Sequence, residues 1–326
     1  MSSPLVPATT QQYAKAIDPA VRKFFTNKYA QLDPMVEKVL NVDTQVDFNQ
    51  QEQTMFGLGA LTQVNEAQIF PEDVPMAGFT TTYSPTKFGV DVPISRELQK
   101  YDKSGLFQIK QLAEARANSA AFAVGQRGAS LFNNGFDTGS TSYGDAKPLF
   151  STSHTRADGG TAQSNASSSG IPLTEANYET GLIAFRQQVD DRGLAISSIP
   201  DTLLVPIALE KEAIIIVKSD LRSGTADNDV NPYAMKEYKG GMANIISWNF
   251  ISSYLGGSDT AWFLLDSKNH KVSWKWGWKP EIVSANETVG FRNQTIYFQV
   301  SFQSSIGWSD WRYAWGSLGA GAVYSS

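Results

Sequence analysis

Residues 104–134, SGLFQIKQLAEARANSAAFAVGQRGASLFNN, carry the strongest helical pattern in this chain of 326 residues. Small and apolar residues recur there at spacings of three and four, namely Leu106, Ile109, Ala113, Ala117, Ala120, Ala121, Val124, Gly128, Leu131 and Phe132. This is the period of an α-helix with one packed face, and the sequence Asn-Asn-Gly after Phe132 is a typical helix stop. We therefore predict one long helix over Ser104–Asn134 whose narrow, alanine-rich stripe packs closely against a sheet or another helix.

The region before this helix, residues 54–93, has the features of a long β-hairpin with a loose tip. Its β-favouring Phe, Thr, Tyr and Val residues are interrupted by turn formers, which are Gly57, Gly59, Pro71, Pro75, Gly78 and Pro85. The region ends in the alternating sequence FGVDVPI. Such a ribbon has little core of its own and should need partners to be ordered.

The first fifty residues are predicted to form two short helices and an extended arm. Asp18-Pro19 and Asp33-Pro34 each begin a helix, because aspartate caps a helix and proline is favoured at its first position. Residues 41–53 are polar and Gln-rich with little periodicity, so we expect an extended segment there.

The remainder of the chain is predicted to be an α+β body. Residues 136–170 are rich in Gly, Ser and Thr and should form a mobile surface loop. Thr174 caps a helix that Gly193 closes, TLLVP is a buried strand, and the following PIALEKEAIIIVKS is a helix. GTADNDVNPY has the composition of a loop, and the text from ANIISWNFISSYLG to QTIYFQVSFQSSIGW alternates in the manner of strands.

Composition excludes several classes of function. The chain has a net charge of −5 and a pI near 5.2, which disfavours direct nucleic-acid binding, although a small basic inner surface in an assembly is not excluded. It has no cysteine, so disulfides and thiolate chemistry are absent. Neither a signal sequence nor a membrane-length apolar run is visible, so we expect a cytoplasmic protein in which the sequons at Asn165, Asn286 and Asn293 are chance matches.

No catalytic, cofactor or metal site is predicted. The two histidines, His154 and His270, are interpreted as a solvated loop residue and a β-turn residue. The acidic cluster Asp220, Asp227 and Asp229 could hold calcium, but it lacks the EF-hand spacing, so a solvated loop is favoured. No phosphate-binding, nucleophile-elbow or zinc-protease motif occurs.

Three tryptophans, Trp274, Trp276 and Trp278, alternate along one predicted strand and so point to one face. They could form a sugar-stacking platform or a packed sheet face. We favour packing, because the neighbouring strands are equally aromatic.

Charge is distributed unevenly between the hairpin region and the long helix. Residues 39–86 contain no lysine or arginine but six carboxylates, and residues 103–132 set four basic residues against the single acid Glu114. Complementary fields fix register on association, so this pattern predicts that copies of the chain lie across one another. The candidate inter-subunit contacts are Glu52, Glu66, Glu72 and Asp73 on one copy and Lys103, Lys110, Arg116 and Arg127 on the next.

Several ordered motifs resemble a known family. These are FGVDVPISRELQKYD, the helix ending in LFNNGF, DAKPLFSTSHTRADGG, TLLVPIALEKEA, GTADNDVNPY and FQVSFQSSIGWSDWRYAWGSLG. Together they resemble the major head subunits of tailed bacteriophages, specifically those like the phage Mu head protein. The resemblance covers the chain from about Thr54 to its end.

The resemblance implies the HK97-like capsid fold, an α+β fold with four regions. Residues 1–53 would be the N-terminal arm, 54–93 the extended E-loop hairpin, 94–172 the P domain with its spine helix, completed by strands within 290–312, and 173–326 mainly the A domain. It also implies a structural protein of the virion, assembled in the host bacterial cytoplasm into hexamers and pentamers of an icosahedral shell around double-stranded DNA. The implied partners are further copies, a separate scaffolding protein, a portal, a decoration protein in some members and packaged DNA bound by non-specific contact, with no membrane and no cofactor.

One departure and two alternatives accompany this resemblance. The HK97 shell is locked by isopeptide bonds that need a hairpin lysine, and here the first lysine is Lys87, near the hairpin base, so covalent locking is not expected. An encapsulin-like nanocompartment would use the same fold around a protein cargo. A carbohydrate-binding or hydrolytic domain that uses the tryptophan face is the alternative from another class.

Overall fold

The structure is a computed structural model in which residues 10–95, 107–139, 143–220, 230–234, 244–284 and 295–319 are described. The α-helices are α1 (Thr10–Gln31), α2 (Val36–Val39), α4 (Phe107–Asn133), α5 (Glu175–Arg186) and α6 (Glu210–Lys218). The strands are β1 (Asn41–Thr44), β2 (Gln50–Phe56), β3 (Met76–Tyr83), β4 (Thr86–Ser95), β5 (Thr202–Val205), β6 (Asn244–Ser247), β7 (Trp262–Leu265), β8 (Val272–Ser284), β9 (Thr295–Trp308) and β10 (Ala314–Ser317). Short 3₁₀ turns are η1 (Ile207–Leu209), η2 (Pro232–Ala234), η3 (Asn249–Ile251) and η4 (Ser253–Leu255).

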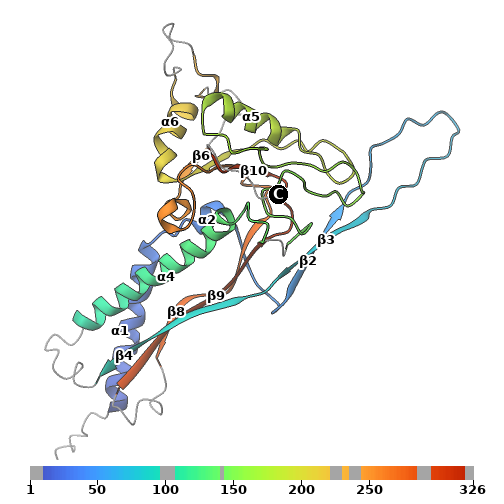
Figure 1. Ribbon diagram of the computed structural model, residues 1–326. Helices are drawn as coiled ribbons and strands as arrows, with labels where there is room; N and C mark the ends of the chain where they lie inside the picture. Colours follow the sequence, from blue (N-terminus) through green and yellow to red (C-terminus); the bar gives the residue numbers. More distant parts are fainter. Residues whose placement is uncertain are drawn as a thin grey trace, which may run out of the picture.

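Three sheets organise these elements. The first has the order β1-β8-β9-β4, the second β10-β7-β5-β6, and the third is the two-stranded ribbon β2-β3. Among the strand pairs of the described residues, β1–β8 and β5–β6 are parallel and the others are antiparallel. In Figure 1 the first sheet runs towards the end of the molecule that carries α1 and α4, the second lies beneath α5 and α6, and the ribbon projects from the opposite side.

The lobe that contains α1 and α4 has its own core. Val21 and Phe25 of α1 pack with Ala113 and Ala117 of α4, and both helices cover the sheet residues Val92, Ile94, Ile282, Phe298 and Val300. Ala117 is fully buried. Its small side chain lets the two helices pack closely at this point. The predicted alanine-rich stripe of the long helix is therefore confirmed, and α4 ends at Asn133 as expected; the predicted start at Ser104 lies outside the described residues.

A central aromatic core joins the C-terminal half of α4 to the sheets. Trp274 and Trp276 are buried there at a ring-centroid distance of 4.8 Å, together with Trp248, Phe263 and Trp308. Trp278 is only partly buried, and its indole N–H lies 3.3 Å from the Ser301 hydroxyl. Packing, rather than sugar stacking, therefore explains the tryptophan strand.

A third core lies under α5 and α6. Tyr178, Leu182 and Phe185 of α5 pack with Trp262 and Trp315 of the second sheet. Thr174 caps α5 as predicted, accepting a hydrogen bond from the Asn177 N–H, but the helix ends at Arg186 rather than at Gly193. The end comes early because residues 187–196 form a tight turn, in which the Asp190 carboxylate accepts the N–H groups of Arg192 and Leu194.

The N-terminal predictions need correction. Helix α1 begins at Thr10 and runs through Pro19, which therefore does not start it. The helix continues because Val21 and Phe25 are anchored on α4, and this packing outweighs the hydrogen bond that proline cannot donate. The second helix is a single turn, α2, and residues 41–53 are not one extended arm, since β1 pairs with β8 and β2 belongs to the ribbon.

The hairpin is present, but its strands differ from those predicted. It pairs β2 with β3, so its first strand starts at Gln50, before the predicted Thr54. Strand β4 leaves the hairpin after Ser84 and Pro85 and pairs along its whole length with β9. The alternating sequence of β4 predicted a strand correctly, but it does not show which strand is its partner.

Two further segments were interpreted wrongly. Residues 136–170 are not simply a surface loop, because Leu149, Phe150, His154 and Asn165 within them are buried. The segment ANIISWNFISSYLG, residues 243–256, was predicted to form strands. Among its described residues only β6 is a strand, and η3 and η4 follow it. Residues 221–229 of the predicted acidic loop lie outside the described residues.

Candidate inter-subunit surfaces

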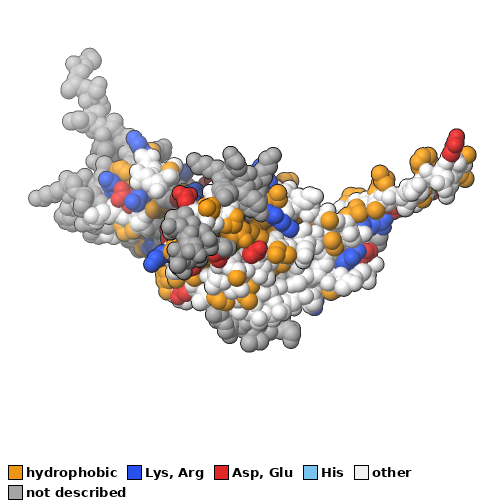
Figure 2. Space-filling view, turned by 90° about the horizontal axis from the view of Figure 1, so that it is seen from above, with side chains coloured by type: hydrophobic (Ala, Val, Ile, Leu, Met, Phe, Trp, Pro, Cys, Tyr) orange, Lys and Arg blue, Asp and Glu red, His pale blue; other side chains and the backbone are white. Residues whose placement is uncertain are grey.

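The most prominent surface is the hairpin, which stands away from the body (Figures 1 and 2). Its outer part, residues 60–72, which we call the tip, is exposed along almost its whole length. Three large apolar side chains there face solvent, with exposed fractions of 101% for Leu61, 91% for Ile69 and 77% for Phe70. Burial of such side chains is worth about 1.5–3 kcal/mol each, so the tip is suited to contact another protein surface.

A polar contact holds the hairpin just below the tip. The Asp73 carboxylate accepts the N–H of Gly59, in the other arm of the hairpin, at 2.6 Å, and it forms an ion pair with Arg192 of the body. The Arg192 guanidinium, followed by the Gly59 N–H, lowers the pKa of Asp73, so this carboxylate stays charged well into the acidic range. This contact holds the two arms of the hairpin together and attaches them to the turn at residues 190–193.

The base of the hairpin is held by buried contacts. Lys275 of β8 is almost completely buried, forms an ion pair with Glu52 of β2, and lies 4.5 Å from the ring centroid of Tyr83. Burial of Tyr83, with the nearby Glu52 charge, raises the pKa of its phenol. The Thr81 hydroxyl donates to the carbonyl of Trp308 at 3.2 Å and accepts the Gly144 N–H at 3.1 Å. The inner half of the hairpin is thus fixed to the body.

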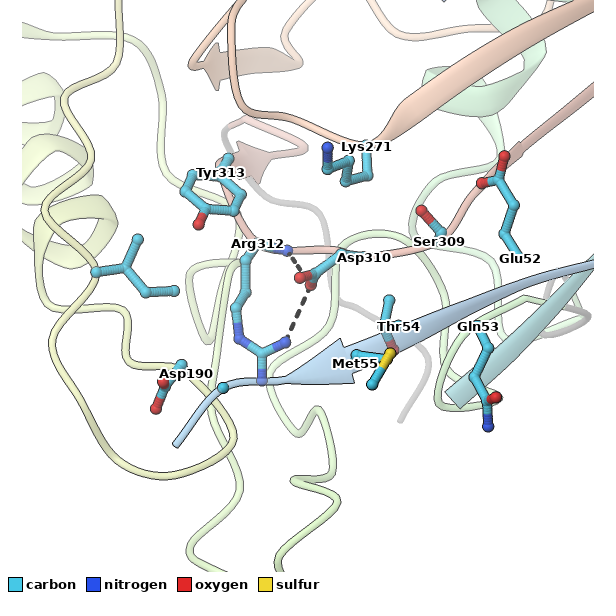
Figure 3. Close-up of a pocket in the computed structure, with 12 residues that line it drawn as sticks. Glu52, Gln53, Thr54, Met55, Asp190, Lys271, Ser309, Asp310, Arg312 and Tyr313 are labelled. Carbon is cyan, nitrogen blue, oxygen red and sulfur yellow. Dashed lines mark hydrogen bonds and ion pairs between the residues drawn. The ribbon is translucent and has the colours of Figure 1, made fainter. Parts of the chain in front are cut away.

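A groove of about 600 Å³ lies between the hairpin base and the body (Figure 3). Its central arginine is already paired within the chain, since Arg312 donates to Asp310 at 3.1 Å and lies 2.7 Å from the Asp191 carboxylate. Desolvation of Asp191 raises its pKa in spite of this arginine. The groove therefore presents a packed junction rather than a convergent set of catalytic groups.

The four acidic candidates divide into two pairs. Glu52 and Asp73 are engaged within the chain, by Lys275 and Arg192 respectively. Glu66 and Glu72 are exposed in the tip. Sequence analysis could not separate the two pairs, because Lys275 and Arg192 lie more than a hundred residues away in the chain.

The basic candidates also differ from one another. Lys110 is half exposed and lies 3.7 Å from Glu114 one turn along α4, and Arg116 is partly exposed. Arg127 is instead part of the packing: its guanidinium donates to Ser304 at 3.1 Å and covers the Phe88 ring at 4.8 Å, and desolvation lowers its pKa. Lys103 lies outside the described residues.

His154 is not the solvated residue that its polar neighbours suggested. It is completely buried, with Nδ1 2.9 Å from the Asp145 carboxylate and Nε2 3.0 Å from the Asn165 side-chain oxygen. Its ring stacks on Trp311 at a centroid distance of 4.2 Å. Asn165 is itself fully buried, and its amide donates to the carbonyls of Leu149 and Trp311. This network ties the loop of residues 145–165 to the end of the chain.

His270 occupies the predicted turn between two strands, but it is buried there. Burial lowers its pKa to about 4, and its Nδ1 accepts the Val272 N–H at 3.3 Å. Within the described residues no cluster of histidine and acidic side chains could hold a metal ion, and Asp227 and Asp229 of the possible calcium cluster are not among those residues. None of the helices in the described part of the chain is long and apolar enough to span a bilayer.

Comparisons with known proteins identify a family and a fold. The family described as phage capsid protein matches residues 78–316. The chain is similar to the capsid of a native GTA particle (13% identity, TM-score 0.54, covering 88% of this chain and 90% of that chain) and to that of an empty GTA particle (13%, 0.53, 88% and 90%). It is also similar to the capsid of Myoviridae phage XM1 (11%, 0.50, 86% and 89%). No curated protein sequence matches it. At these identities the likeness shows the fold, and it bears out the predicted α+β capsid fold of the HK97 type.

Proposed function

Because this chain belongs to the phage capsid protein family and is a structural major capsid protein, we propose that it builds an icosahedral head around double-stranded DNA from hexamers and pentamers of itself. The observation that carries the proposal is the family match, which spans the second hairpin strand, the long helix and the body. An encapsulin-like compartment is not favoured by this match. The carbohydrate-binding alternative is not supported, because Trp274 and Trp276 are buried and cannot stack on a sugar.

The four predicted regions take the corresponding roles in this proposal. Residues 1–53 are the N-terminal arm, the hairpin is the E-loop, α4 is the spine helix of the P domain, and residues 173–326 form mainly the A domain. Two observations support this division: β9 pairs with β4 next to α4, and α5 and α6 share a separate core with the second sheet. The E-loop strands are better bounded by Gln50 and Tyr83 than by 54 and 93.

Partners other than the chain itself follow from the same proposal. A shell of this kind is filled through a portal and is shaped by a separate scaffolding protein, and a decoration protein can cover its outside. Assembly takes place in the cytoplasm of the host bacterium, and the protein then remains in the virion. The chain supplies structure in this scheme and no catalytic step.

Electron microscopy of the purified full chain tests the function directly. We expect closed particles of uniform size, with DNA in those taken from a productive infection. Each contact between neighbours need bury only about 1,600 Å², since repetition around a closed shell multiplies weak contacts. Only monomers under every salt and scaffold condition would contradict the proposal, and particles filled with a protein cargo would favour the nanocompartment.

We assign the alignment of neighbouring subunits to the exposed charges. In this proposal Glu66 and Glu72 of the exposed tip pair with Lys110 and Arg116 of an adjacent copy, and each such pair is worth about 0.2–1 kcal/mol and is screened by salt. Lys103 remains a candidate basic partner. Glu52, Asp73 and Arg127 act within the subunit and so contribute to registration by positioning the hairpin and the helix.

Reversal of the two exposed tip charges should slow or misdirect assembly. We expect the double variant Glu66→Lys, Glu72→Lys to assemble several-fold more slowly at low salt than the wild type, measured by light scattering. The subunit should stay folded, because neither carboxylate has a partner in the described part of the body. Reversal of Lys110 and Arg116 to glutamate in the same chain should partly restore the rate. Unchanged assembly would mean that these charges only keep an exposed ribbon soluble.

A further inference from the structure

We propose that the solvent-facing side of α1 is the surface that contacts the phosphates of the packaged DNA. The inference rests on the proposed function and adds to it the location of the contact. It starts from a contrast within the chain, because a protein of net charge −5 carries basic residues and no acid over the C-terminal part of one helix, after Asp18 and Pro19. Between Pro19 and Gln31 the helix carries Arg22, Lys23 and Lys28 and no carboxylate.

Packing decides which side of α1 is available. Val21 and Phe25 are buried against α4 and the sheet, so the opposite side of the helix faces solvent. Lys23, Thr26 and Asn27 are exposed on that side. These side chains are hydrogen-bond donors of the types that contact phosphate oxygens, and no negative charge interrupts them.

The junction of α1 and α4 also carries groups that can bind a negatively charged ligand. A groove of about 250 Å³ runs between the helices and is lined by Phe24, Asn27, Lys28, Gln31, Lys110 and Glu114. Glu114 is the one acid in this lining, and Lys110 lies 3.7 Å from it. The groove therefore offers the ammonium group of Lys28 and two side-chain amides to a negatively charged ligand.

The surrounding carboxylates do not cancel these charges. Asp33 pairs with Lys38, and Glu37 lies 3.8 Å from Lys279. Among the described residues, no carboxylate forms a salt bridge with Lys23 or Lys28. Figure 2 shows Lys and Arg side chains at this end of the molecule, with some Asp and Glu side chains among them, and an acidic side chain at the far end of the hairpin.

Dimensions and affinity both fit DNA packed inside a shell. The part of α1 between Pro19 and Gln31 corresponds to about 20 Å at 1.5 Å per residue, a little over half a turn of B-DNA. Two or three phosphate contacts give only weak binding to one subunit. Many subunits in a shell multiply this weak contact, while each one still releases the DNA readily.

DNA binding by dissociated full-length subunits tests the inference. The probe is a fluorescein-labelled duplex of about 30 base pairs, and the affinity is measured by polarisation over a series of salt concentrations. We expect the variant Lys23→Glu, Lys28→Glu to bind about tenfold more weakly than the wild type at low salt. The slope of log K against log salt should fall by about 2, because each phosphate contact contributes about 0.9.

A matched control separates position from net charge. Lys211→Glu, Lys218→Glu changes the net charge equally on exposed positions of α6, and it should bind more nearly as the wild type does. Equal weakening in both variants, or no measurable binding by the wild type at low salt, would overturn the inference. Microscopy of the same variants tests the proposed function separately, because particles that form normally but retain less DNA support both proposals. If no variant forms particles, the polarisation result still decides where DNA binds.

Discussion

Removal of the hairpin tip should abolish shell formation and leave the subunit folded. In the variant, residues 60–72 are replaced by Asn-Gly, a turn that joins antiparallel strands with two residues. The ends of the deletion are already adjacent, since the Gly59 N–H lies 2.6 Å from the Asp73 carboxylate. The tip contributes three large exposed apolar side chains and no buried side chain, so its loss takes contacts from the neighbour and not from the core.

Particle yield by sedimentation and microscopy gives the result, and circular dichroism reports the fold. We expect no particles from the shortened variant and a thermal transition within a few degrees of that of the wild type. A second variant, Leu61→Ser, Ile69→Ser, Phe70→Ser, keeps the length of the hairpin and removes only its apolar surface. It should also fail to assemble if burial of these side chains drives the contact. Normal yields from both variants would show that neighbours do not bind the tip.

Substitution of His154 by alanine should destabilise the subunit by about 3–5 kcal/mol, which is the typical cost of truncating a large, fully buried ring. The imidazole fills a fully buried position between Asp145, Asn165 and Trp311. Without it, the Asp145 carboxylate and the Asn165 oxygen each lose a buried hydrogen-bond partner, and a cavity opens beside the indole.

Urea unfolding of the subunit measures this loss. Thr152→Ala, two residues away and exposed, is the matched control and should change the unfolding free energy by less than about 0.5 kcal/mol. The variant Asp145→Asn should lose less stability than His154→Ala, because it keeps an oxygen that accepts hydrogen bonds. If His154→Ala behaved as Thr152→Ala does, the histidine would be the solvated loop residue that its sequence neighbours suggest.

The helices and strands with local signals were predictable. Thr174 was identified as a cap from the polar residue before a periodic segment, and α4 from its three-and-four spacing and the Asn-Asn-Gly stop. The strand β5 followed from a short apolar run before a proline. These features depend on residues within one or two turns of one another, so the sequence alone contains them.

The features that were missed depend on distant partners. His154 lies in a polar segment, and its burial depends on Trp311, which is far along the chain. The sequence presents the charges of Glu52 and Asp73 as available for a neighbouring subunit, because it does not show that Lys275 and Arg192 lie beside them. Likewise, β4 alternates as a hairpin strand would, and only its register with β9 shows that it belongs to another sheet. Of the candidate contact residues, the sequence thus identified the charges but not which of them remain accessible.

Strands β8 and β9 have mechanical importance, because they span from the central aromatic core to the lobe that holds α1 and α4. Their pairing is irregular on either side of Trp278, between Trp276 and Glu281, where Pro280 has no N–H to donate. A ladder with missing bonds is more compliant than a regular one, so bending of the subunit should concentrate at this point. In an icosahedral lattice, flat and strongly curved regions have to be built from one polypeptide. A soft segment between two stiff ends lets the same chain fit both curvatures without repacking either core.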